Sequence, residues 1–311
     1  MSGVTVTTRT LAPAVARTPL LLVGVALAIV YVVWGSTYLA IRIMVEEMPP
    51  LVSAGVRFLA AGLLVGGAVA VRRGPGRLAV TRRQLLGCAQ IGLLLVVMGQ
   101  GLVTVAEDGG APSGITALLI AAVPLWVICY RVLSGERPAG RTVAGVATGF
   151  AGIVVLVVVN GLGGAFPTWT MAVVLVAGLS WAFGSWYQPR IRLPRDPFVV
   201  AVYEMLIGGG VLTIIGMARG ERFDAAAYSA QSWAAWGYLV LFGSVLAFSA
   251  YIWLLQSTAT SLAATYAYVN PLVAVCLGWL ILAEPVTVQT LVGGVIVVLA
   301  VAVVVRTEFQ R

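Results

Sequence analysis

The chain has 311 residues, of which 60% are hydrophobic and only 10% charged, with a mean hydropathy of +1.02. An ordinary soluble domain carries about 25% charged residues, so this composition excludes a soluble globular protein. The net charge of +8 comes from 19 basic residues, all arginine. They lie mostly in short segments between apolar runs rather than on one basic face, so no nucleic-acid partner is expected.

Apolar runs follow a polar segment, residues 1–19, and continue almost to the end of the chain. A membrane-spanning helix needs about 20 apolar residues, and the runs are long enough for ten of them. The predicted helices cover residues 20–44, 50–71, 84–106, 112–131, 141–159, 168–188, 197–217, 233–256, 261–282 and 287–305. The predicted fold class is therefore an all-α membrane protein with ten transmembrane helices.

The loop arginines predict the orientation of these helices. If the N-terminus is cytoplasmic, nearly all of them fall on the inner side, and the outer loops contain only Arg219 and Arg222. By the positive-inside rule both termini are then cytoplasmic, residues 1–19 and 306–311 being the two tails. A multi-pass protein of a bacterial-type cytoplasmic (inner) membrane is expected, either a monomer or a homodimer.

An internal repeat divides the chain. The pattern aromatic-Gly-Ser-x-Tyr at residues 34–38 recurs at residues 183–187, and the later landmarks keep nearly the same offset: Pro124 corresponds to Pro271 and Glu136 to Glu284. The predicted repeats are residues 20–159 and 168–305. Because each holds five helices, an odd number, the second must begin on the opposite side of the membrane. Inverted repeats of this kind are common among secondary transporters.

These residues resemble the drug/metabolite transporter superfamily, and within it the EamA-like exporters. The resemblance covers about residues 20–305, and the motifs that carry it are Trp34-Gly35-Ser36, Pro50 followed by Arg57-Phe58, Pro124, Pro271 and Leu282 to Pro285. It implies a substrate cavity between two EamA-like repeats and the export or exchange of amino acids, related metabolites or amphipathic toxic compounds. Small multidrug exporters of this superfamily couple to protons through a glutamate in their first helix, which the first helix here lacks.

Two charged residues inside predicted helices are the sharpest local signal, because a charge near the bilayer centre costs at least ~2.5 to 3.5 kcal/mol. Arg57 either attracts an anionic group of the substrate or locks an outer gate; alternatively, it satisfies carbonyls at a helix end. Glu204 either accepts protons or binds a cationic group; alternatively, it pairs with an inner arginine such as Arg195. The two lie at depths that differ by roughly 10 Å, so an untilted pair does not touch.

Two acids near the predicted outer mouth, Glu107 and Asp108, are expected to be solvated. Glu107 is a second candidate for proton coupling.

Prolines predict breaks in the fourth and ninth helices, at Pro124 and Pro271. Proline leaves a backbone carbonyl without its helical donor, and a polar break near the midplane often marks a transporter's site. Asn270, with Tyr266 and Tyr268 shortly before it, is therefore a candidate for the substrate cavity. Asn270 bridging two helices is the alternative.

Other amphipathic side chains are candidates to line a cavity for an aromatic or zwitterionic ligand, although interfacial anchoring or packing is the commoner role of such residues. These candidates are Trp34, Ser36, Tyr38, Gln100, Trp181, Ser185, Tyr251 and Trp253. The pairs Gly62-x-x-x-Gly66 and Gly145-x-x-x-Gly149 predict close helix packing instead.

Enzyme chemistry has little support in this sequence. Histidine is absent, no nucleophile or phosphate-loop motif occurs, and Cys88, Cys129 and Cys276 lie in apolar runs, as small buried hydrophobes do. No metal site or cofactor is predicted. The prediction is a secondary active or facilitative transporter for a small organic metabolite, such as an amino acid, that works by alternating access in the lipid bilayer. The alternatives are proton-coupled efflux of amphipathic cations and, less favoured, a channel or lipid scramblase.

Overall fold

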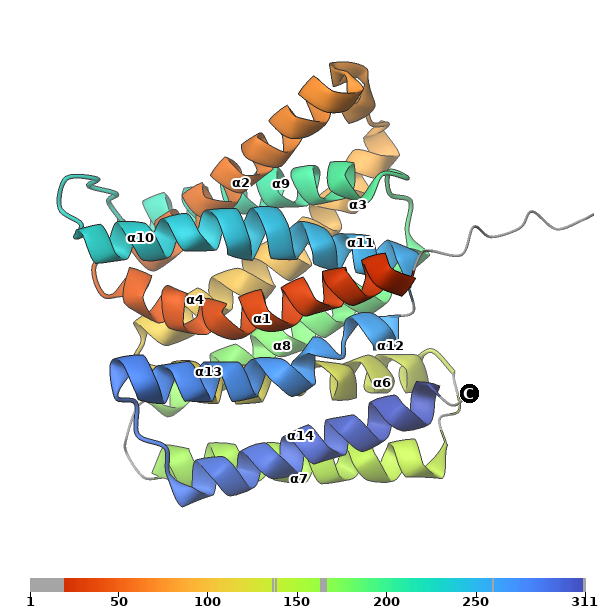
Figure 1. Cartoon of the computed structure of the whole chain (residues 1–311), viewed down its shortest axis with the longest axis vertical. Coiled ribbons are helices and arrows are strands. Elements are labelled where there is room, and N and C mark those ends of the chain that lie inside the picture. Colours follow the sequence, from red (N-terminus) through yellow and green to blue (C-terminus); the bar gives the residue numbers. More distant parts are fainter. Residues whose placement is uncertain (1–19, 136, 138, 163–166, 259, 310–311) are drawn as a thin grey trace, which may run out of the picture.

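A computed structural model describes residues 20–309 except positions 136, 138, 163–166 and 259. Within that part of the chain the helices form ten rods, where a rod is one long helix or a run of consecutive helical segments (Figure 1). The first five are α1 (Leu20–Val45); α2 (Pro50–Arg73), followed by the short η1 (Pro75–Leu78); α3 (Arg82–Gly92) with η2 (Leu93–Gly101) and α4 (Leu102–Asp108); α5 (Ser113–Ile120) with α6 (Val123–Leu133); and α7 (Gly140–Leu162). The other five are α8 (Thr168–Tyr187) with the short η3 (Gln188–Arg190); α9 (Pro197–Ala218); α10 (Ala230–Tyr238) with η4 (Leu239–Phe248) and α11 (Ser249–Ser257); α12 (Thr260–Ala263) with α13 (Tyr266–Leu282); and α14 (Val288–Phe309).

The ten-helix, all-α membrane fold is confirmed. Seven of the described rods are long and apolar enough to cross a membrane, and two further apolar stretches lie at 269–282 and 291–300. Hydrocarbon offers the backbone no hydrogen-bond partners, so an apolar chain in lipid must form helices, which satisfy these groups internally. Pro50 and Pro197 occupy first-turn positions, where the missing N–H costs no helical bond.

The contacts between rods show the inverted repeat. α2 packs mainly against its counterpart α9, and α7 against its counterpart α14, which lies beside it along one edge of the molecule (Figure 1). α1 packs against α13, and the counterpart of α1, α8, packs against the α5–α6 rod. Exchanging each of these rods for its counterpart leaves these main contacts unchanged, as expected of two structurally equivalent halves.

The two ends of the bundle differ in charge. The glutamate face carries Glu47, Glu107, Glu221 and Glu284, at the turns that join α1 to α2, α4 to α5, α9 to α10, and α13 to α14. The arginine face carries Arg72, Arg73, Arg82 and Arg190, at the ends of α2 and η3 and the start of α3. These faces correspond to the outer and inner sides predicted from the sequence.

Four rods depart from a regular α-helix, in two symmetric pairs. η2 and η4, which are counterparts, are wound more widely with π-type hydrogen bonds, a conformation frequent at functional sites. The fourth rod is interrupted at residues 121–122 and the ninth at residues 264–265.

The two predicted helix-breaking prolines lie at different distances from these interruptions. Pro124 is the second residue of α6, so the first interruption lies close to the predicted position. α13 runs through Pro271, and its interruption lies more than one turn earlier than predicted. The ring of a proline crowds the turn that precedes it, so the distortion falls on the N-terminal side.

Glycines let the helices approach closely, as the Gly62 pair predicted: a Cβ on Gly62 would lie 2.9 Å from the Leu206 side chain of α9. The closest approach involves two glycines not singled out from the sequence. A Cβ on Gly55 would lie 2.7 Å from the carbonyl oxygen of Gly209, and a Cβ on Gly209 would lie 2.7 Å from that of Gly55. The backbones of α2 and α9 are therefore in direct contact at these two glycines.

Substituting Gly209 with alanine is expected to destabilise the bundle by about 1 to 3 kcal/mol, the usual cost of overpacking, because the new methyl group meets backbone atoms that cannot move aside. The adjacent Gly210 is a matched control, since a Cβ there meets nothing within 4 Å. Thermal unfolding of the detergent-purified variants measures the difference: the Gly209→Ala midpoint should fall and the Gly210→Ala midpoint should stay or rise. Equal midpoints would contradict the close-contact argument.

The cysteines were predicted to be buried, and Cys88 is, whereas Cys276 is exposed on α13. In a membrane an exposed apolar position faces lipid, which is as apolar as the core, so hydropathy does not separate the two environments.

Candidate functional site

Four aromatic rings meet inside the bundle, one from the first repeat and three from the second. Trp34 of α1 contacts Trp181 of α8 (ring centroids 5.3 Å apart), Tyr251 of α11 (4.9 Å) and Tyr266 of α13 (5.4 Å). All four rings are buried. The predicted candidates Trp34, Trp181, Tyr251 and Tyr266 therefore form one central aromatic cluster, contributed by both halves of the chain.

Hydrogen bonds orient this central aromatic cluster. The indole of Trp181 donates to the Tyr251 hydroxyl (3.2 Å), and Ser185 lies 2.7 Å from the same hydroxyl. The indole of Trp34 donates to the carbonyl oxygen of Gly243 in η4 (3.1 Å). On the symmetry-related side, Ser180 of α8 donates to the carbonyl oxygen of Leu94 in η2 (2.9 Å). Each π-type stretch thus offers a backbone carbonyl to a rod of the opposite repeat.

A small cavity of about 20 Å³ lies between the repeats against this cluster. Five predicted residues line it: Trp34, Tyr38, Gln100, Trp181 and Tyr266. One water molecule needs about 10 to 15 Å³, so the cavity holds roughly one water and no organic solute. In this conformation the cavity therefore has no room for an organic ligand.

Arg57 contacts Gln100, one of the residues that line this cavity. Its Nε donates to the Ser244 hydroxyl of η4 (3.0 Å), its Nη2 donates to Gln100 Oε1 of η2 (3.1 Å), and its guanidinium lies 4.3 Å from the Phe58 ring centroid. Nη1 has no hydrogen-bond partner, and no carboxylate among the described residues pairs with this buried cation. Arg57 thus links the two π-type stretches, one from each repeat, and keeps a donor unused. It does not bond the helix-end carbonyls of the alternative interpretation.

Glu204 of α9 is fully buried, and neither of its carboxylate oxygens has a hydrogen-bond partner among the described residues. It forms no ion pair with Arg195, the partner considered from the sequence, nor with Arg57. A buried, unpaired carboxylate is costly in its charged form, so proteins retain one chiefly where it changes protonation or meets a ligand.

Glu107 was expected to be solvated, and this expectation is wrong: the side chain is completely buried, and both carboxylate oxygens lack a hydrogen-bond partner. Arg42 of α1 crosses the end of α4 and donates to the backbone carbonyl of Glu107 (2.6 Å), not to its carboxylate. Asp108, the next residue, is exposed as expected. Consecutive helical positions face different directions, and only packing decides which of two adjacent acids meets water.

Two other candidates lie apart from the cavity. Ser36 hydrogen-bonds Tyr238 at 2.6 Å, on another side of α1. Trp253 is half-buried and lies two residues from Tyr251, so the two face nearly opposite sides of α11. The side chain of Tyr268 lies outside the part of the chain that the structure describes.

Asn270 bridges two helices. With its amide nitrogen turned toward them, it donates to the carbonyl oxygens of Tyr31 (3.0 Å) and Tyr266 (3.2 Å), in α1 and α13. These contacts match the bridging alternative left open from the sequence.

The sequence analysis missed several small residues at the cavity. Thr37, Ile41, Gly99, Val103, Ile120 and Ala177 also line it. Gly99 was the one with a readable signal, because it stands beside Gln100 in a Gly-Gln-Gly sequence inside a helix. A Cβ on Gly99 would lie 2.7 Å from the Trp181 ring.

Gly99→Ala is expected to push the Trp181 ring into the cavity and to weaken ligand binding by about tenfold or more, with little change in fold. The cavity beside Trp181 has space for only about one water, so a small shift of the ring fills it and leaves no space for a ligand. Gly67→Ala, where a Cβ meets nothing within 4 Å, is the control. Ligand-induced thermal shifts measure the effect, and unchanged binding in Gly99→Ala would show that Trp181 does not shape the site.

The glutamate face is closed by three carboxylates that each cap a helix of the other repeat. Glu221 accepts from the backbone N–H groups of Leu51 (3.0 Å) and Val52 (2.8 Å) at the start of α2. Glu284 accepts from the N–H of Ser113 (2.9 Å) at the start of α5, and also from its hydroxyl (2.9 Å). An anion at a helix N-terminus satisfies unpaired N–H groups and meets the positive end of the helix dipole.

The third of these cross-repeat caps runs in the opposite direction. Glu47, after α1, accepts from the Ser229 N–H (2.7 Å) and the Ser232 hydroxyl (2.7 Å) at the start of α10. The hydrogen bonds from Ser232 and Ser229 lower the pKa of Glu47. A lowered pKa in the folded state means that this cap stabilises the fold above the ordinary glutamate pKa and is lost as the pH falls through the lowered value.

Two inverted five-helix repeats around a central site that both repeats build are an architecture common among membrane transporters. The chain matches the EamA-like transporter family over residues 22–158 and 168–306. It therefore belongs to that family, which is a family of transporters and not of enzymes, and its ligand is a small molecule.

Individual relatives agree with this membership. The chain is 46% identical to the uncharacterized inner membrane transporter YedA of Escherichia coli (strain K12), over 81% of this chain and 80% of YedA. It is 26% identical to the uncharacterized transporter YvbV of Bacillus subtilis (strain 168), over 89% and 90%. It is 27% identical to a probable amino-acid metabolite efflux pump of Escherichia coli (strain K12), over 62% and 61%. A solved crystal structure with 20% identity has the same fold, with a TM-score of 0.64 over 93% of this chain and 98% of its own.

Proposed function

We propose that this protein exports or exchanges an amino acid or a closely related metabolite across the cytoplasmic (inner) membrane by alternating access. The glutamate face is then the outer side, and both termini are cytoplasmic, as the positive-inside rule predicts. Transport is driven by the substrate gradient or by a coupled ion and needs no cofactor. Two relatives, an inner membrane transporter and a probable amino-acid metabolite efflux pump, support the location and the substrate class.

The observation that carries the proposal is the position of Arg57. A buried guanidinium with a free donor, one hydrogen bond from the cavity through Gln100, suits a carboxylate, which binds guanidinium by short, charge-assisted hydrogen bonds. The faces of Trp34 and Trp181 suit the ammonium group of the same ligand, because a cation is attracted to an aromatic face. A zwitterion presents both groups.

Arg57 also suggests how binding leads to movement. A substrate carboxylate competes with Gln100 and Ser244 for the guanidinium, so binding loosens the link between η2 and η4, and hence between the repeats. A ligand shifts a conformational equilibrium only through such differential contacts. Opening toward the glutamate face then requires the cross-repeat caps of Glu47, Glu221 and Glu284 to break.

Counterflow in proteoliposomes tests this function. Liposomes preloaded with an unlabelled amino acid should accumulate the labelled compound transiently and with saturation, which a channel or a scramblase does not do. The panel comprises amino acids, metabolites and lipophilic cations. Saturable counterflow by at least one zwitterion supports the proposal. Non-saturable flux would favour a channel, and a response to lipophilic cations alone would favour multidrug efflux.

Proton-coupled efflux is the second candidate, and the buried, unpaired carboxylate of Glu204 favours it. If Glu204 carries the proton, Glu204→Gln should abolish substrate accumulation driven by a pH gradient while counterflow, which needs no net proton movement, continues. Glu107→Gln is the parallel variant, since Glu107 is a second buried and unpaired carboxylate in the described part of the chain. Accumulation that persists in both variants, or wild-type transport that ignores the pH gradient, would exclude proton coupling through these residues.

A further inference from the structure

A lipid-facing groove of about 220 Å³ lies at the arginine face, apart from the central cavity. One wall is α2; the opposite wall is formed by Val245 of η4 and Ser249 of α11, with Phe198 of α9 between them. Figure 1 shows the C-terminal half of α2 diverging from the α10–η4–α11 rod. The walls come from different repeats, so the groove lies across the boundary between the two halves.

The groove is apolar along its length and basic at one end. Along α2 its lining recurs every four residues, as Leu64, Ala68 and Arg72, which places these side chains in one row along the helix. Since Arg72 is at the end of α2, the row runs from hydrocarbon depth to the surface and finishes in a positive charge.

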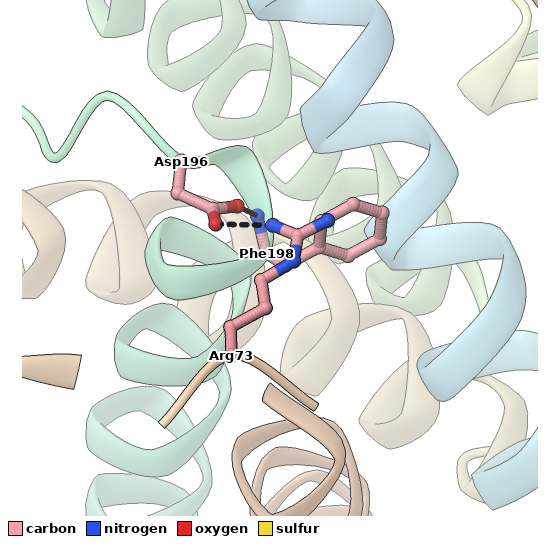
Figure 2. Close-up of polar contacts among 3 residues, drawn as sticks. All are labelled: Arg73, Asp196 and Phe198. Atoms are coloured by element: carbon pink, nitrogen blue, oxygen red, sulfur yellow. Dashed lines mark hydrogen bonds and ion pairs between the residues drawn. The ribbon is translucent and has the colours of Figure 1, made fainter. Parts of the chain in front are cut away.

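The two arginines at this end differ. Arg73 is already paired: its Nη1 lies 2.6 Å from Asp196 Oδ2, and its guanidinium lies 5.7 Å from the Phe198 ring centroid (Figure 2). Asp196 is held in turn by the Phe198 N–H (3.0 Å). Arg72 is exposed, and among the described residues it forms no ion pair. The rim thus has one neutralised guanidinium and one free to bind an anion.

A polar atom inside the groove also lacks a partner. The Ser249 hydroxyl oxygen is buried and forms no hydrogen bond with the described residues. A buried hydroxyl without a partner costs free energy, and a ligand with an ester oxygen at this depth would satisfy it.

We propose that this groove binds an anionic phospholipid, with one acyl chain along the Leu64–Ala68 row and the headgroup phosphate at Arg72. Hydrocarbon chains are the apolar ligand available at this depth, and basic pockets near the cytoplasmic surface bind anionic headgroups. An anionic headgroup supplies the negative charge that would pair with the Arg72 guanidinium. Because the groove has walls from both repeats, a bound acyl chain contacts both of them. The lipid therefore stabilises the conformation in which the groove has this shape.

Thermal unfolding of the full chain in phosphatidylcholine nanodiscs tests the proposal, with phosphatidylglycerol added in increasing amounts. The expected result is a saturable rise of the unfolding midpoint with phosphatidylglycerol, because a ligand that binds the folded state stabilises it by mass action. Arg72→Gln should weaken the apparent affinity by about tenfold or more. Ala68→Phe changes no charge but places a large side chain where the acyl chain would lie, so it should weaken the apparent affinity as well. Arg141→Gln, an exposed arginine at the start of α7, should leave it unchanged.

Three results would overturn the proposal. Equal loss in Arg72→Gln and Arg141→Gln would mean a general surface charge effect rather than a site. The same rise with inorganic phosphate alone would mean an anion site without a lipid chain. Full affinity in a folded, monodisperse Ala68→Phe protein would show that no acyl chain binds in the groove.

Discussion

Arg57→Gln is expected to lower the affinity for a zwitterionic substrate roughly thirtyfold or more, because truncating one partner of a buried charge pair costs at least ~2 kcal/mol. Arg57 is the buried guanidinium with an unused donor beside the cavity. Wild type should bind an amino acid better than its amide, which lacks the negative charge, whereas Arg57→Gln should no longer distinguish the two. Saturable thermal shifts and counterflow with both compounds give the comparison.

Ser244→Ala separates binding from a purely structural role of Arg57. This variant removes the hydrogen bond between Arg57 and η4 but keeps the positive charge. If the guanidinium binds the substrate carboxylate, Ser244→Ala should retain the wild-type affinity or exceed it, because one competitor for the guanidinium is gone. If Ser244→Ala loses affinity as severely as Arg57→Gln, the link between η2 and η4 matters and Arg57 does not contact the ligand.

Glu284→Gln is expected to open the glutamate face. The change removes charge-assisted hydrogen bonds to the Ser113 N–H and hydroxyl and to the Gly114 N–H (3.3 Å), which join the two repeats. Hydrogen bonds to a charged group contribute about 1.5 to 3 kcal/mol each. Glutamine keeps one neutral oxygen as an acceptor, so the closed state should lose only part of their sum, on the order of 2 to 4 kcal/mol. A cysteine placed at the cavity residue Ala177, with the three native cysteines replaced, reports the opening. Its labelling from the outer side by a membrane-impermeant thiol reagent should quicken at least about tenfold.

Gly278→Ala offers an independent route to the same state. A Cβ on Gly278 would clash with Glu284 Oε2, so the methyl group displaces the carboxylate without altering its charge. Glu46→Gln is the matched control, since Glu46 is an exposed glutamate on the same face. Faster labelling in both Glu284→Gln and Gly278→Ala, but not in Glu46→Gln, supports the cross-repeat caps as an outer gate. Unchanged labelling in Glu284→Gln would contradict it.

Much of the architecture could be read from the sequence. The ten helices follow from hydropathy, because a chain in hydrocarbon must bond its own backbone and a run of about 20 apolar residues is the length that crosses. The inverted repeat follows from motif spacing and from the odd number of helices in each half. Trp34, Trp181 and Arg57 were recognisable because aromatic and charged side chains stand out in an apolar background.

Tertiary packing alone decided which of these side chains meet. Hydropathy does not distinguish a position facing lipid from one facing another helix, since both surroundings are equally apolar, and lateral helix contacts depend on close steric fit. For that reason the sequence did not show that Glu107 is buried, that Gly55 and Gly209 bring two backbones together, or that Arg57 joins Gln100 to Ser244. These contacts connect residues far apart in the chain, and only the folded bundle brings them within hydrogen-bonding distance.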